Sequence, residues 1–151
     1  MHISTLTQYT PETARRIREL LIQLSRSGKD KGEIPEQWFT DIINSPWHDL
    51  LIATDDDGKI IGLACMSVIM GPGIRKNAYL EDFVTDNQVR GQGIGSALWQ
   101  EMLNWAKAHG CQNFEFTCGH GRETAQQFYK SKGAEIYDTN FFRLSLNDSA
   151  N

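Results

Sequence analysis

The sequence lacks several features that would by themselves define a class of protein. No apolar run approaches the roughly 20 residues that a membrane-spanning helix needs, so we expect no membrane association. The first residues, MHISTLTQYTPETARR, contain no apolar segment of the kind found in secretory signal peptides. We therefore expect a cytoplasmic protein.

Cysteine and positive charge are also scarce. Cys65, Cys111 and Cys118 form no CxxC pair and no metal-type spacing, which predicts reduced thiols and no metal site. With 15 basic side chains against 19 acidic ones the net charge is −4, which argues against binding to a nucleic-acid phosphate backbone. We expect neither a bound metal nor a nucleic-acid partner.

The composition that is present is that of an ordinary globular protein, with 40% hydrophobic and 23% charged residues. A chain of 151 residues predicts a single domain, 1–151. Periodicity, caps and turn residues predict helices at 9–28, 35–46, 94–110 and 122–133, strands at 2–7, 78–86, 113–118, 134–138 and 141–146, and a hairpin at 49–69. Thr10 is the predicted cap of the first helix and Gly28 its predicted stop, and the pair Asp57-Gly58 predicts the hairpin turn. The order β-α-α-β-β-β-α-β-α-β-β indicates an α/β (α+β) fold, with a mixed sheet flanked by helices.

The stretch VRGQGIGSAL, residues 89–98, places three glycines where a helix is predicted to begin. Glycine costs about 1 kcal/mol relative to alanine inside a helix, so a function must offset that cost. A glycine-lined helix start offers unpaired backbone N–H groups to an anion, and the missing side chains let a phosphate approach closely. A P-loop is excluded because no lysine follows the glycines, and the GxGxG spacing past the middle of the chain does not fit a dinucleotide fold.

The loop satisfies a third pattern, [QR]-x-x-G-x-[GA], at residues 90–95, and it resembles the acetyl-CoA loop of GNAT-superfamily N-acetyltransferases. A later segment, RETAQQFYKSKGAEIY, resembles the superfamily's second landmark, R-x-x-A-x-x-F-Y-x-x-x-G-[FA]. The element order fits the superfamily across nearly the whole chain, and the detailed pattern is most similar to the small-amine branch, such as glucosamine-phosphate and aminoalkylphosphonate acetyltransferases. The chain departs from many relatives in having no proline shortly before the loop and in having Ala134 after Gly133.

This resemblance implies direct transfer of an acetyl group from acetyl-CoA, the co-substrate, to an amine. It assigns the pyrophosphate to the loop residues Arg90, Gly91, Gln92, Gly93, Ile94, Gly95 and Ser96. It places the pantetheine arm against the backbone of Phe83, Val84 and Thr85, with the N–H of Val84 stabilising the oxyanion. Arg122 stands where many relatives contact the pantetheine arm, and it could instead bind a phosphate or an anionic group of the acceptor.

The resemblance also names candidate catalytic residues. Tyr129 matches the tyrosine that protonates the departing thiolate. Glu81 is our choice as the base that takes the amine proton, with attraction of a cationic acceptor as its alternative role; strand alternation sends Glu81 and Asp82 to opposite faces. His120 is another candidate base, and Cys118 would permit a covalent route, although direct transfer is the rule in the superfamily.

The sequence therefore predicts an acetyl-CoA-dependent N-acetyltransferase whose acceptor is a primary amine of a small metabolite. Cues to that acceptor conflict: Arg75 and Lys76 suit an anionic molecule, whereas Glu33, Glu36 and Asp41 suit a polyamine. The alternatives are acetylation of a protein lysine or N-terminus, acetylation of aminoacyl-tRNA, or a non-catalytic acetyl-CoA sensor. A homodimer is one option, since the apolar segment NFFRLSL fits either a subunit interface or a core strand.

Overall fold

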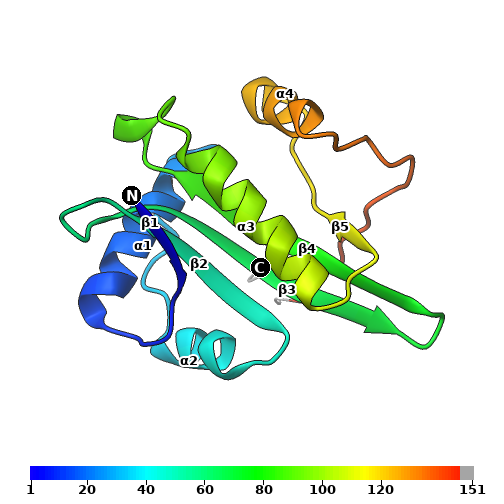
Figure 1. Cartoon of the computed structure of the whole chain (residues 1–151), viewed down its shortest axis with the longest axis horizontal. Coiled ribbons are helices and arrows are strands. Elements are labelled where there is room, and N and C mark those ends of the chain that lie inside the picture. The colour runs from blue at the N-terminus through cyan, green and yellow to red at the C-terminus, as the bar shows by residue number, and fades with distance from the viewer. Residues whose placement is uncertain (147–151) are drawn as a thin grey trace, which may run out of the picture. The chain divides into compact units, whose positions relative to one another are not determined.

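The protein is described by a computed structural model that covers residues 1–146 (Figure 1). The chain forms two compact units, Met1–Thr117 and a second that begins at Cys118. The single domain that the chain length suggested stays a prediction. Across residues 1–146, no helix has both the length and the apolar character needed to cross a membrane.

The first unit is built on one five-stranded sheet with the order β1-β2-β3-β4-β5 (Figure 1). The strands are β1 His2–Thr5, β2 His48–Thr54, β3 Ile60–Gly71, β4 Arg75–Thr85 and β5 Asn113–Glu115. Pairing is antiparallel from β1 to β4, and β4 pairs with β5 in parallel. The expected mixed α/β class and the hairpin at 49–69 are thereby confirmed.

Three helices and one short 3₁₀ turn accompany this sheet. They are α1 Pro11–Leu24, α2 Glu36–Asn44, η1 Asn87–Val89 and α3 Ile94–Ala108. The side chain of Thr10 accepts a hydrogen bond from the N–H of Thr13 at 3.1 Å, so the predicted cap of α1 is confirmed. The predicted stop at Gly28 is wrong, because α1 ends at Leu24 and Ser25 leaves the helical conformation.

Helices α1 and α2 pack on one face of the sheet and α3 packs on the other (Figure 1). The core on the first face consists of Leu6, Ile17, Leu20, Phe39, Leu50, Ile60, Leu63, Cys65 and Val84. On the second face, a Cβ placed on Gly62 would lie 3.1 Å from Leu98 Cδ1 and 3.2 Å from the carbonyl oxygen of Val84. The absence of a side chain at residue 62 thus lets the first turns of α3 pack close to the end of β4.

The second unit contains α4, Glu123–Ser131, which ends before Gly133 in the left-handed conformation (φ 85°). The strands expected at 134–138 and 141–146 are wrong: residues 134–146 are described and form no strand. Their large apolar side chains are exposed, namely Ile136, Tyr137, Phe141, Phe142, Leu144 and Leu146. Apolar alternation indicates β-propensity, but a strand also needs a paired neighbour to satisfy its backbone.

Candidate active site

The glycine loop joins β4 to α3 through a tight, left-handed path. After η1 and Arg90, Gly91 and Gly93 have φ angles of 80° and 82°, a region that side chains other than glycine rarely adopt. Gly93 is the N-cap of α3 and, having no side chain, it makes no capping hydrogen bond. The predicted helix start at Ile94 is confirmed, and the loop owes its shape to two of its glycines.

The start of α3 has the properties of an anion site. The first N–H groups of a helix have no acceptor within the helix, and they carry its positive end. A Cβ placed on Gly91 or Gly93 would meet no other atom of residues 1–146 within 4 Å, so this part of the chain leaves the space outside the loop open. Arg90 lies in the same loop and is exposed. Open space, unsubstituted backbone and an N-cap residue without a side-chain acceptor fit the pyrophosphate of acetyl-CoA.

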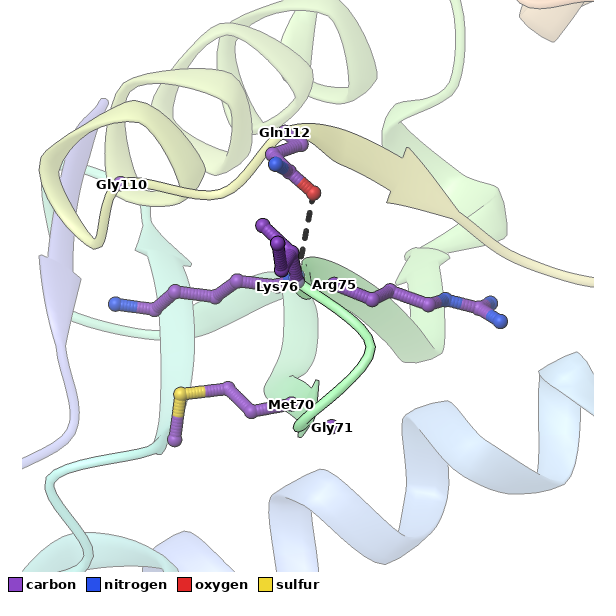
Figure 2. Close-up of a pocket in the computed structure, with 7 residues that line it drawn as sticks. Met70, Gly71, Arg75, Lys76, Gly110 and Gln112 are labelled. Carbon is purple, nitrogen blue, oxygen red and sulfur yellow. Dashed lines mark hydrogen bonds between the residues drawn. The ribbon is translucent and has the colours of Figure 1, made fainter.

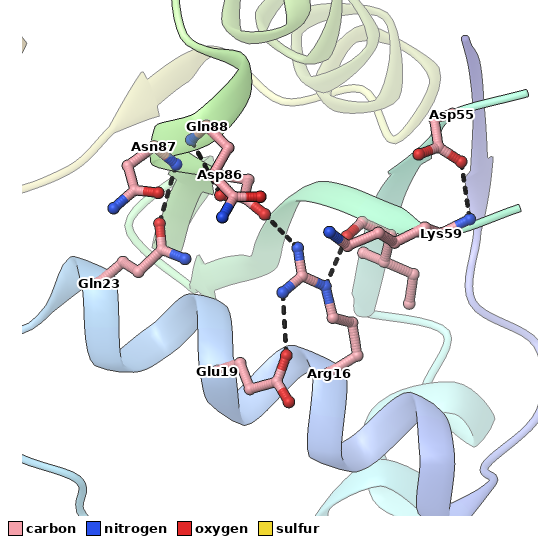
Figure 3. Close-up of polar contacts among 9 residues, drawn as sticks. Arg16, Glu19, Gln23, Asp55, Lys59, Asp86, Asn87 and Gln88 are labelled. Atoms are coloured by element: carbon pink, nitrogen blue, oxygen red, sulfur yellow. Dashed lines mark hydrogen bonds and ion pairs between the residues drawn. The ribbon is translucent and has the colours of Figure 1, made fainter. Parts of the chain in front are cut away.

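A buried ion pair holds the segment that leads into this loop (Figure 3). Arg16 of α1 donates from Nη2 to Asp86, from Nη1 to Glu19 at 2.9 Å and from Nε to the carbonyl oxygen of Ile60 at 2.8 Å. The side chain of Asp86 is only 3% exposed and that of Arg16 is 16% exposed. One guanidinium therefore ties α1, β3 and the end of β4 together.

Two further hydrogen bonds hold η1, one from its own cap residue and one from α1 (Figure 3). Asp86 accepts from the N–H of Gln88 at 3.1 Å, and Gln23 accepts from the N–H of Asn87 at 2.9 Å. Burial alone would raise the pKa of Asp86, but hydrogen bonds from Gln88 and Arg16 and the charge of Arg16 outweigh it and lower that pKa. Asp86 is therefore an ionised anchor for the loop.

Strand β4 carries an extra residue at the position of its two consecutive carboxylates. Leu80 is paired with Met66 and Asp82 with Cys65, which leaves Glu81 as a β-bulge. Paired residues share a face of the sheet, so Asp82 lies on the α1/α2 face with Cys65. The Glu81 side chain accepts a hydrogen bond from Ser67, two residues from Cys65 and hence on the same face. Simple alternation is thus the wrong expectation here, because both carboxylates face the α1/α2 side.

The surroundings of this carboxylate pair disfavour its negative charge. Burial raises the pKa of Asp82, the charge of Glu81 raises it further, and Lys31 acts in the opposite direction. Burial, together with the charges of Asp82, Glu81 and Asp49, raises the pKa of the Cys65 thiol to about 12. Cys65 is therefore an inert core thiol, and a cationic group beside Glu81 and Asp82 would relieve their mutual repulsion.

The parallel ladder between β4 and β5 is short. It joins Asn77, Ala78 and Tyr79 to the three residues of β5 and reaches no further toward the carboxylates. Beyond Tyr79, the part of β4 that leads to the glycine loop is therefore not paired with β5. A linear ligand can add itself to strand edges of this kind.

The remaining predicted site residues belong to the second unit. Tyr129 lies on α4, where its ring contacts Phe128 at 5.6 Å between centroids. Burial raises the pKa of Tyr129 to about 12, Cys118 adds to the increase and Arg122 opposes it. Arg122 is the N-cap residue of α4. Tyr129 thus keeps its proton at neutral pH, as a proton donor must.

Residues 14–134 match the model of the Acetyltransferase (GNAT) family. The chain belongs to this family. The expectation from the glycine loop and the F-Y landmark is therefore confirmed at the level of the family.

Two curated relatives of this GNAT chain are thialysine N-epsilon-acetyltransferases. The protein from Mus musculus is 30% identical over 76 residues, which are 50% of this chain and 45% of the relative. The protein from Sus scrofa is 31% identical over 75 residues, covering 50% and 44% respectively. The match thus spans about half the length of these relatives.

Solved structures share the fold over nearly the full length. A tetramutant of the BH1408 protein from Bacillus halodurans has a TM-score of 0.80 at 21% identity, covering 97% of this chain and 100% of the other. An aminoglycoside acetyltransferase from an uncultured soil metagenomic sample, in complex with trehalose, has a TM-score of 0.80 at 19% identity, covering 95% of both chains. These likenesses establish the GNAT fold of the chain.

A cavity of about 280 Å³ lies at the opposite end of β4 from the glycine loop (Figure 2). It is lined by Met70, Gly71, Ile74, Arg75, Lys76, Gly110 and Gln112. Figure 2 shows the side chains of Arg75 and Lys76 extending in opposite directions. Arg75 pairs with Glu115 at 3.0 Å, and Lys76 Nζ lies 5.3 Å from the centre of the Trp47 ring. The ten residues from Lys76 to Thr85 span roughly 33 Å of extended strand, so this cavity is separate from the loop.

Sequence reasoning missed the ion pair that holds the glycine loop and the hydroxyl that hydrogen-bonds to Glu81 of β4. Arg16 and Asp86 are 70 positions apart, and Ser67 and Glu81 are 14 apart. No local pattern marks such pairs, because each depends on the register of β3 and β4. A polar Ser67 inside the apolar run IIGLACMSVI was the one available signal.

Proposed function

We propose that this chain transfers the acetyl group of acetyl-CoA directly to a primary amine of a small metabolite. The observation that carries the proposal is the uncapped, glycine-shaped start of α3, reached directly from a strand with two same-face carboxylates. Family membership and the thialysine and aminoglycoside enzymes among similar proteins support the same chemistry. The acceptor is proposed to be cationic because Glu81 and Asp82 share the α1/α2 face.

Binding of acetyl-CoA is proposed to use two features of the first unit. The first-turn N–H groups of α3, from Ile94 onward, hold the pyrophosphate, and Arg90 adds positive charge. The pantetheine arm lies along β4 beyond Tyr79, where the β4–β5 ladder has ended. The resemblance assigned the oxyanion to the N–H of Val84, but that N–H points to β3, because Asp86 two residues later donates to the carbonyl oxygen of Ile61 in the same ladder. An N–H of β4 that points to the other edge is therefore proposed to stabilise the oxyanion of the tetrahedral intermediate.

Transfer itself needs two protons to leave the nitrogen and one to reach the sulfur. An alkylammonium is protonated at neutral pH, so Glu81 takes one proton from the amine, directly or through water, before attack. The nitrogen then forms a bond to the thioester carbon and gives up its second proton to water, and the carbon–sulfur bond breaks. The thiolate that leaves takes a proton from Tyr129, whose pKa is raised to about 12 by burial, and Tyr129 regains a proton from water. The products are an N-acetyl amine and coenzyme A.

Thiol release in the presence of acetyl-CoA tests the proposal. We would compare thialysine, a polyamine and the aminoglycoside sisomicin with a lysine-containing peptide and aminoacyl-tRNA. Release with a small amine supports the proposal, and release with the peptide or tRNA alone would replace the acceptor class. Failure of the folded protein to bind acetyl-CoA would overturn the proposal, and binding without release for any acceptor would indicate a sensor.

The proposed acid is tested by Tyr129→Phe, with Tyr137→Phe as the matched control. Tyr137 lies in the same unit and is 85% exposed, so loss of its hydroxyl should not change the rate. We expect kcat to fall by about 100-fold for Tyr129→Phe, within the range typical of a lost general acid. Equal rates for the two variants would remove Tyr129 from the mechanism.

A further inference from the structure

Ser67 is an unusual residue within the most buried strand of the sheet. It follows seven consecutive buried positions of β3, from Ile60 to Met66, and is itself only 5% exposed. Its Oγ donates a hydrogen bond to Oε1 of Glu81 at 2.9 Å. A buried hydroxyl requires a partner, and here the partner is the side chain of an exposed residue.

The bulge explains why Glu81 depends on this hydrogen bond. As the extra residue of β4, Glu81 has no paired residue on β3 whose side chain could pack beside it. Within residues 1–146, the hydrogen bond from Ser67 is the only hydrogen bond or ion pair that engages the Glu81 carboxylate. Without it, the long side chain would be free to sample several rotamers.

The hydrogen bond also leaves the carboxylate able to act. Ser67 engages Oε1, so Oε2 remains available to accept a proton. The same hydrogen bond keeps Glu81 on the α1/α2 face, where the bulge also leaves Asp82. Ser67 thus holds Oε1 of Glu81, and the direction of Oε2 is fixed with it.

We propose that Ser67 is a positioning residue that orients the Glu81 carboxylate for proton transfer from the acceptor amine. This role rests on the proposed function, in which Glu81 is the base. Ser67 touches neither substrate, and it acts through the direction that it imposes on Glu81. Its hydrogen bond is a connection between neighbouring strands that the register of β3 and β4 makes possible.

A double-mutant cycle tests this role against a merely structural one. Ser67→Ala removes the donor, Ser67→Thr keeps it, and Glu81→Gln removes the base at nearly constant size. We expect Ser67→Ala to lower kcat about tenfold with the KM for acetyl-CoA unchanged, and Ser67→Thr to stay within about threefold of the wild type. In the Glu81→Gln background, Ser67→Ala should have no further effect.

A second readout does not depend on activity. In protein labelled with ¹³C at glutamate carboxyls, Ser67→Ala should change the chemical shift of the Glu81 carboxyl at neutral pH. The control Ser131→Ala should leave it unchanged, because the Ser131 hydroxyl donates to the carbonyl oxygen of Phe128 and not to Glu81. An unchanged Glu81 signal in Ser67→Ala would overturn the proposal whatever the enzyme's activity.

The outcomes separate this proposal from the proposed function. Equal losses from Ser67→Ala in both backgrounds would assign Ser67 a structural role and overturn the proposal while leaving an acetyltransferase. Full activity of Glu81→Gln would do the same, because there would be no base to position. Absence of thiol release by the wild type with every acceptor would overturn the function itself, and the positioning role with it.

Discussion

The two ends of β4 each carry an arginine–carboxylate pair, yet the pairs differ in what surrounds them. At the Thr85 end, Arg16 and Asp86 are 16% and 3% exposed, and Arg16 also reaches the backbone of β3. At the Arg75 end, Arg75 and Glu115 are 62% and 37% exposed and border an open cavity. Similar chemistry therefore anchors the glycine loop at one end and stays solvated at the other, and burial makes the difference.

The largest effect is expected at the loop itself, from Gly93→Glu. The variant places a side chain where φ is 82° and brings a negative charge to the proposed pyrophosphate site. We expect the affinity for acetyl-CoA to fall by at least about 100-fold, since both contributions oppose binding. Isothermal titration calorimetry of the wild type and the variant measures this loss.

Gly58→Glu is the matched control for that experiment. Gly58 lies in the turn between β2 and β3 and also has a φ of 82°, and a Cβ there would also meet no atom within 4 Å in the described part of the chain. The backbone strain is therefore similar, but the position is away from the loop. Equal loss of acetyl-CoA binding in both variants would mean that Gly93→Glu acts through folding and not through the site.

The next largest effect is expected from Asp86→Asn at the anchored end of β4. The substitution leaves the Arg16 guanidinium with only part of its compensation, because Glu19 remains as a partner. We expect a loss of about 2–3 kcal/mol in the free energy of unfolding, near the lower end for a broken buried pair. We also expect acetyl-CoA to bind several-fold more weakly, because the loop loses its anchor. Urea denaturation and calorimetry give the two quantities.

Asp30→Asn is the control for this variant, because Asp30 also pairs with an arginine of α1, Arg18. That pair is exposed, and it is at the loop after α1, so we expect a smaller loss of stability and unchanged binding. If Asp30→Asn destabilised the protein as much as Asp86→Asn, burial would not be the factor that separates the two ends of β4.

The contribution of Asp86 should also depend on pH. Its pKa is lowered in the folded protein by the hydrogen bonds and charge that outweigh its burial. The unfolded chain therefore binds more protons, so the stabilisation is complete above the unfolded pKa of about 3.9 and is lost as pH falls through the folded value. The stability difference between wild type and Asp86→Asn should shrink below about pH 4. A constant difference down to pH 3 would contradict this origin.

Features set by neighbouring residues could be predicted from the sequence. Local signals predicted the helix start at Ile94, the cap at Thr10 and the hairpin turn at Gly58, because each depends on neighbouring residues. The family followed from two motifs for the same reason. Tyr129 and Glu81 stay predictions as catalytic residues.

Features set by register could not be predicted in this way. The bulge at Glu81 depends on how β4 lies against β3, and it reversed the expectation that Glu81 and Asp82 face opposite sides. The strands expected at 134–138 and 141–146 do not form, because alternation of apolar residues indicates β-propensity but does not identify a strand to pair with. The anchor of the loop joins residues from α1 and β4 that only tertiary packing brings together.

The smallest effect is expected at the exposed end, from Arg75→Ala. The substitution removes one solvent-exposed ion pair with Glu115, and Glu115 keeps a hydrogen bond from Asn77 at 2.9 Å. We expect a loss of at most about 1 kcal/mol in the free energy of unfolding and no change in the affinity for acetyl-CoA. Urea denaturation in low and high salt would show the small difference disappearing as the exposed charges are screened. Weaker acetyl-CoA binding in Arg75→Ala would instead couple the cavity to the loop and erase the distinction between the two ends of β4.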